Sequence, residues 1–91
     1  MGLKSTTTCL GYQQITSLSS STALTVPADA TLALIVPETQ NVRWRDDGVA
    51  PTASVGMLVP ANASMSYDGD LKAIRFIAAT SGAILNVSYY A

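Results

Sequence analysis

The chain has no histidine and a single cysteine, Cys9, among its 91 residues. Without a second cysteine no disulfide forms within one chain, and the usual zinc ligand sets are incomplete. Cys9, the serines and the threonines also lack a histidine base to activate them as nucleophiles. The sequence contains no G-x-S-x-G turn and no glycine-rich phosphate loop. We therefore expect a protein that is not an enzyme and holds no cofactor, with Cys9 as a small buried thiol.

Charge is also scarce. Charged residues make up 12% of the chain, about half of the roughly 25% typical of soluble domains. The formal net charge of −1 disfavours a nucleic-acid partner, which requires a basic patch. The longest apolar run, residues 32–36, has the length of one strand, whereas a membrane span needs about 20 residues. We expect neither nucleic acid nor a membrane as a partner. We interpret the sparse charge as typical of a subunit that contacts copies of itself and neighbouring proteins.

What the chain does contain is a series of short strand patterns separated by turn residues. This series predicts an all-β protein, a two-sheet β-sandwich with a jelly-roll or Greek-key path. We expect one domain over residues 1–91, with residues 1–8 as an extended arm. The seven or eight strands are expected near residues 9–16, 22–26, 31–36, 41–46, 54–59, 64–67, 72–78 and 83–90.

Alternation along these strands predicts which side chains face the core, because successive residues of a strand point to opposite faces. The predicted core comprises Leu34, Val42, Trp44, Tyr67, Ile74, Phe76 and Val87. Tyr89 and Tyr90 point to opposite faces, so at most one joins the core. We consider both as interface candidates, because an aromatic ring adds contact area at low entropic cost.

Two stretches, residues 42–48 and 67–76, hold eight of the eleven charged residues. Each stretch combines a turn rich in aspartate with a strand that carries basic side chains. We interpret these residues as structural ion pairs and turn caps. They are Arg43, Arg45, Asp46, Asp47, Asp68, Asp70, Lys72 and Arg75.

Other interpretations of the same stretches stay open. Asp46, Asp47, Asp68 and Asp70 are candidates for a cation site, although neither loop has the spacing of an EF-hand. Two of these carboxylates would also suit a general acid and base. Trp44, between two arginines, would suit the stacking of a sugar or a base, but alternation turns its ring towards the core.

The strings RWRDDG (residues 43–48), YDGDLKAIRFI (67–77) and LNVSYY (85–90) resemble small proteins encoded among the virion structural genes of tailed bacteriophages. The resemblance covers residues 20–91 and implies a β-rich virion component with no catalytic residues. It leads us to expect a capsid decoration (cement) protein that is assembled in the host cytoplasm. Its expected partners are its own copies, in a homotrimer, and the major capsid protein at subunit junctions.

Two other roles remain as alternatives. The first is a tail, neck or fibre subunit of the virion. The second is a small lectin-like jelly roll, with Trp44, Tyr67 and the aspartates as the glycan site.

Overall fold

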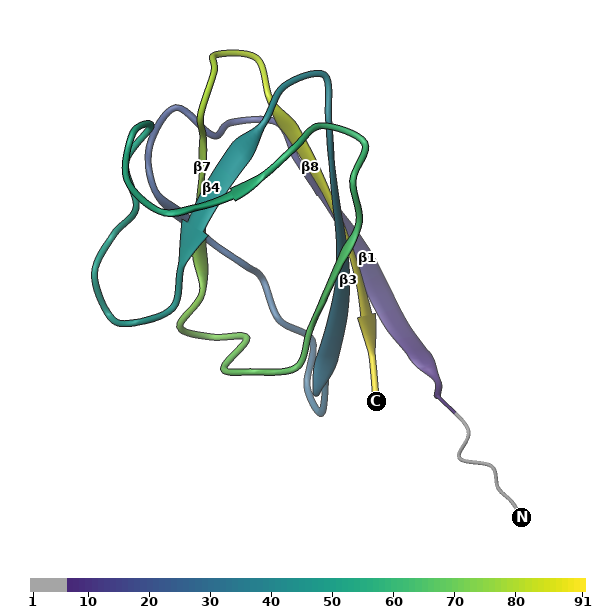
Figure 1. Ribbon diagram of the computed structural model, residues 1–91. Helices are drawn as coiled ribbons and strands as arrows, with labels where there is room; N and C mark the ends of the chain where they lie inside the picture. Colours follow the sequence, from purple (N-terminus) through teal and green to yellow (C-terminus); the bar gives the residue numbers. More distant parts are fainter. Residues whose placement is uncertain (1–6) are drawn as a thin grey trace.

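The computed structural model describes residues 7–91 as two four-stranded antiparallel sheets packed face to face, with no helix among those residues (Figure 1). Sheet A has the strand order β1 (Cys9–Ile15), β8 (Ile84–Tyr90), β3 (Leu32–Glu38), β6 (Met65–Tyr67). Sheet B has the order β2 (Thr22–Ala23), β7 (Arg75–Ala78), β4 (Val42–Arg45), β5 (Met57–Val59). The predicted all-β sandwich is therefore confirmed.

The strand pairing is that of a jelly roll. β1 pairs with β8, β2 with β7, β3 with β6 and β4 with β5, as in one long hairpin whose arms are β1–β4 and β5–β8. The hairpin is rolled so that β8 also pairs with β3 and β7 with β4. Thr8 and Ala91 exchange two backbone hydrogen bonds of 2.9 and 3.0 Å, which extend the β1·β8 pair. Of the expected arm, residues 1–6 lie outside the described residues.

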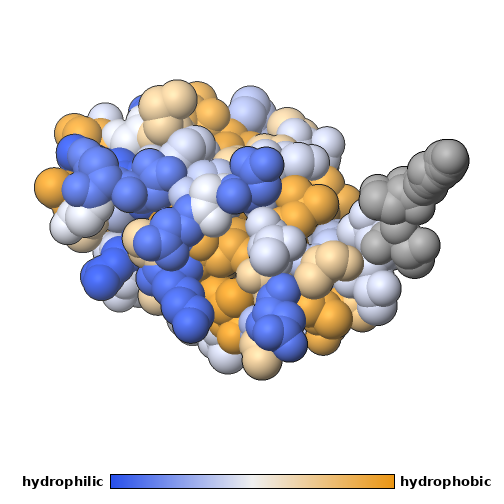
Figure 2. All heavy atoms as spheres, turned by 90° about the horizontal axis from the view of Figure 1, so that it is seen from below, coloured by the Kyte–Doolittle hydropathy of each residue, from blue (hydrophilic) through white to orange (hydrophobic). Residues whose placement is uncertain are grey.

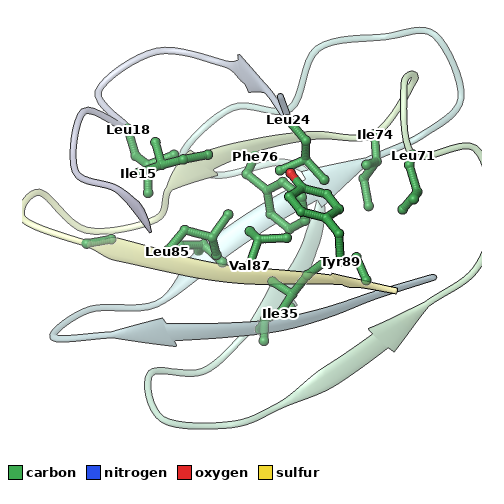
Figure 3. Close-up of a cluster of buried hydrophobic side chains, with 14 residues drawn as sticks. Ile15, Leu18, Leu24, Ile35, Leu71, Ile74, Phe76, Leu85, Val87 and Tyr89 are labelled. Carbon is green, nitrogen blue, oxygen red and sulfur yellow. The ribbon is translucent and has the colours of Figure 1, made fainter. Parts of the chain in front are cut away.

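The core fills the space between the two sheets (Figure 3). Val42, Ile74, Phe76 and Val87 are fully buried there, as predicted. Loop residues such as Leu18, Leu24 and Leu71 are also buried and complete the core beyond the strands. Trp44 and Tyr67 pack against the core from half-buried positions, so they lie at its margin.

Leu34 does not belong to the core, contrary to the prediction. It is 39% exposed, whereas Ala33 and Ile35 beside it are fully buried. Because residues 32–36 are apolar on both faces, alternation alone does not show which face is buried. Ala33 lies between Tyr67 and Tyr89 in the strand register, and a small residue suits the position between two large rings. The tyrosines therefore account for the inward orientation of Ala33 and Ile35.

Tyr89 is a core residue, so its prediction as an interface residue is wrong. Its side chain is 1% exposed, and its hydroxyl donates a hydrogen bond of 2.7 Å to Oε1 of Gln13. Burial raises the pKa of Tyr89 to about 12. Tyr90 is half-buried on the opposite, outward face of β8.

β3 continues through Pro37, where the sequence predicted that the strand would end. Within the described residues, β6 pairs only with Ala33–Ile35, so no strand flanks Pro37 on that side. The Pro37 carbonyl accepts a hydrogen bond of 2.7 Å from the backbone N–H of Asn62 on the same side. In an extended strand the nitrogen and the carbonyl of one residue point the same way. The proline nitrogen, which has no hydrogen, therefore leaves no ladder bond unmade.

Candidate functional site

The motif at residues 43–48 begins on β4, where Trp44 faces the interior and Arg43 and Arg45 face outward. In the register, Trp44 lies between Phe76 of β7 and Met57 of β5. Its ring meets that of Tyr67 edge to face, with centroids 5.8 Å apart and an interplanar angle of 61°. The inward orientation of Trp44 agrees with the alternation of the strand.

Tyr67 connects the two charged stretches of the sequence. Its hydroxyl donates a hydrogen bond of 2.6 Å to Oδ2 of Asp46. Burial, and then the bond to the Asp46 carboxylate, raise the pKa of Tyr67 to about 12. Gly69 lies against the same ring, and a side chain there would collide with the hydroxyl and with ring carbons of Tyr67. The structure therefore uses Asp46 as an acceptor for a tyrosine rather than for a basic side chain.

Arg45 and Asp47 form the ion pair that the sequence predicted for this turn. Nε and Nη2 of Arg45 donate to Oδ1 and Oδ2 of Asp47 at 3.0 and 2.5 Å. This hydrogen bonding raises the pKa of Arg45 and lowers that of Asp47. Oδ1 of Asp47 also accepts a hydrogen bond of 3.3 Å from the backbone N–H of Val49. Asp47 thus shapes the turn and orients Arg45 at the same time.

Arg43 binds backbone carbonyl groups and not a carboxylate. Its guanidinium donates to the carbonyls of Ala53 and Gly56 at 3.1 and 3.0 Å, and so fixes the β4–β5 loop to β4. Gly56 makes this close approach possible. It has a φ of 145°, and a Cβ there would lie 3.1 Å from both Cβ of Arg43 and the Trp44 carbonyl oxygen.

The remaining charged candidates form no ion pairs within residues 7–91, so that part of the prediction is wrong. Asp70 caps its own turn, since its Oδ1 accepts a hydrogen bond of 3.1 Å from the backbone N–H of Lys72. Asp68, Lys72 and Arg75 are exposed. Sequence proximity suggested pairing, but the structure shows a single ion pair among residues 7–91, that of Arg45 and Asp47.

The four aspartates do not form a cation site in the structure. In the described part of the chain, no three histidine, cysteine, aspartate or glutamate side chains are grouped so as to hold a metal ion. Cys9 is exposed, contrary to the expected buried thiol, and its Sγ lies 3.7 Å from the hydroxyl oxygen of Ser88. Among residues 7–91 no helix has the length and apolar character that crossing a membrane requires.

A pocket of about 360 Å³ opens beside the motif. It is lined by Trp44, Arg45, Asp46, Asp47, Val55, Gly56 and Met57. Two large apolar side chains that line the pocket are exposed: Val55 by 53% and Met57 by 60%. We refer to Val55 and Met57 as the β5 patch. Leu58 is also exposed, but it lies opposite Arg43 in the register and therefore on the other face of sheet B. Figure 2 views the sandwich from below relative to Figure 1. On this face hydrophilic side chains gather, with apolar surface between them.

The β5 patch is the feature that sequence reasoning missed. The run from Val55 to Val59 predicted a strand, but its apolar residues gave no indication of which face is buried. In the structure β5 has three residues and lies at the edge of sheet B, where only Val59 reaches the core.

Comparison of the chain with protein-family models, with curated proteins and with solved structures gives no match.

Proposed function

We propose that the protein is a non-enzymatic structural subunit of a phage particle, a capsid decoration protein that binds the assembled lattice through the β5 patch. The exposure of Val55 and Met57 at the pocket is the observation that carries this proposal. Apolar surface rimmed by polar side chains is typical of protein–protein contacts, and here Arg45 and Asp47 form part of that rim. The resemblance of the sequence to virion proteins supports a protein of the phage particle as the partner.

The backbone of β5 offers a second means of contact. Within the described residues β5 pairs with β4 alone, so its other edge is available to a strand of a partner. Strand addition would supply backbone hydrogen bonds, and the pocket beside Trp44 would receive a side chain of the added strand. A protein that binds only the assembled lattice stabilises it by mass action. The many equivalent sites of a capsid compensate for a small contact per copy.

Binding to purified expanded capsids tests the proposal. We expect the wild-type protein to co-sediment with capsids and to raise the temperature at which they open. Met57→Glu should abolish both effects, because it places a charge in the contact, while the melting temperature of the free protein stays unchanged. Thr80→Glu, in the exposed turn before β8, is the matched control and should bind normally. Co-sedimentation with tails alone, or full binding by Met57→Glu, would contradict the proposal.

The composition of the pocket also supports a second function, the binding of a glycan. Trp44 lines the pocket together with Asp46 and Asp47, a combination of aromatic and carboxylate groups that suits a sugar ring. A glycan array would then show specific binding that Trp44→Ala removes and Met57→Glu weakens. An array without specific binding would exclude this function.

A further inference from the structure

The outward face of sheet A is almost free of charge. The register places twelve side chains on it: Cys9, Tyr12, Gln14, Leu32, Leu34, Val36, Glu38, Ser66, Ile84, Asn86, Ser88 and Tyr90. Glu38 is the single charged residue among them, and its Oε1 accepts a hydrogen bond of 2.8 Å from Nδ2 of Asn86. The outward face of sheet B differs, since it carries Arg43, Arg45 and Arg75.

A row of alternating large and small side chains crosses this uncharged face. Tyr12 of β1 lies opposite Ser88 of β8, which lies opposite Leu34 of β3, which lies opposite Ser66 of β6. Tyr12 is 64% exposed and Leu34 is 39% exposed, so both project from the face. Neighbouring strands are about 4.8 Å apart, so each serine leaves a gap as wide as one strand beside a large side chain.

We propose that this face binds a second copy of the chain, about a two-fold axis that runs parallel to β3 and β8 and between them. Rotation about this axis reverses the row. Leu34 then meets the Ser88 position of the second copy, and Tyr12 meets the Ser66 position. A two-fold axis that crosses the strands along this row would place leucine on leucine and tyrosine on tyrosine. Two sheets that pack about 10 Å apart require interdigitated side chains, and in this row the first arrangement provides them.

The size of the face predicts a weak pair. Its three long strands have seven residues each, or about 23 Å, and four strands at about 4.8 Å give a footprint of roughly 400 Å² per copy. Stable interfaces bury about 800 Å² per partner, so the pair should form only at high protein concentration. The axis also brings both Glu38 residues to the same end of the interface, where salt screens their repulsion. Association should therefore strengthen with ionic strength.

Sedimentation velocity over a series of concentrations tests the proposal. From micromolar to millimolar concentration we expect a shift from monomer to dimer, which is larger in high salt. Leu34→Glu should remain a monomer with an unchanged melting temperature. Leu58→Glu is the matched control, because it changes an exposed leucine on sheet B, and it should still dimerise. A wild-type protein that stays monomeric or forms trimers, or a dimer that Leu34→Glu leaves intact, would overturn the proposal.

Cross-linking keeps the test valid if Leu34→Glu does not fold. Leu34→Cys in a Cys9→Ser background should give a covalent dimer with a short bis-maleimide, and Leu58→Cys in the same background should not. Equal cross-linking of the two variants would count against the proposal. The pair stands on the face of sheet A and does not depend on the proposed capsid role. A dimer that fails to bind capsids would therefore contradict that role alone.

Discussion

Tyr67 donates its hydroxyl hydrogen to Asp46 across 2.6 Å, and this bond joins β6 of sheet A to the turn after β4 of sheet B. The two stretches that hold most of the charge thus meet through one hydrogen bond. The same tyrosine ring packs against Trp44, which lines the pocket beside the β5 patch. The position of Tyr67 therefore couples the packing between the sheets to the shape of the proposed binding surface.

We predict that Tyr67→Phe lowers the free energy of unfolding by about 1 kcal/mol, measured by urea denaturation. A hydrogen bond to a charged acceptor contributes about 1.5–3 kcal/mol, and the exposure of Asp46 reduces that value. Gly69→Ala should cost more, because the new methyl group displaces the whole ring. Tyr90→Phe serves as the control. Unchanged stability of Tyr67→Phe would show that the bond contributes nothing in solution.

Stability should fall as the pH rises from about 10 to about 12. The pKa values of Tyr67 and Tyr89 are raised to about 12 in the fold, whereas an unfolded tyrosine has a pKa of about 10. Between these values the unfolded chain loses phenolic protons that the native protein keeps, so alkali favours unfolding. Absorbance at 295 nm should show two late-ionising tyrosines. Tyr67→Phe and Tyr89→Phe should each remove one of them, and ionisation of both near pH 10 would refute the prediction.

Charge reversal of Arg75 should stabilise the protein. Arg75 lies directly opposite Arg45 in the β4·β7 register, and like charges at such positions are destabilising by roughly 0.2–1 kcal/mol. Arg75→Glu should raise the free energy of unfolding by a few tenths of a kcal/mol at low salt, and the gain should disappear at high salt. Arg75→Gln should give about half of this gain in the free energy of unfolding. A loss of stability in Arg75→Glu would instead indicate a carboxylate partner for Arg75 in solution.

Addition of EDTA or of calcium should leave the melting temperature unchanged. Asp46 is bound to Tyr67, Asp47 to Arg45, and Asp70 to the backbone of Lys72, so three of the four aspartates serve the fold itself. Differential scanning calorimetry provides the measurement. A shift of several degrees with either reagent would restore the cation site as the preferred interpretation of these turns.

The strand series and the sandwich were predictable from the sequence, because turn residues and period-two patterns recur along the whole chain. The sequence left the path open between a jelly roll and a Greek key, and the strand pairing is that of a jelly roll. The orientation of β3 was not predictable, since its residues are apolar on both faces. Ala33 is directed inward because it fits between Tyr67 and Tyr89, which lie on distant strands. Such a fit depends on cross-strand register, which the pattern of one strand does not contain.

The candidate site was predictable only in part, because some of its contacts lie within one turn and others depend on how the strands and sheets pack. The pair of Arg45 and Asp47 follows from residues two apart in one turn. The contact of Asp46 with Tyr67 depends on how two sheets stack, and the exposure of Met57 depends on the edge position of β5. Both are consequences of the tertiary structure.

A reconstruction of the whole phage particle by electron cryomicroscopy tests the proposed function most directly. We predict density for this sandwich on the outer surface of the capsid, with Val55 and Met57 against a capsid subunit. Density for the protein in the tail, or on the capsid with these two side chains facing solvent, would contradict the proposal.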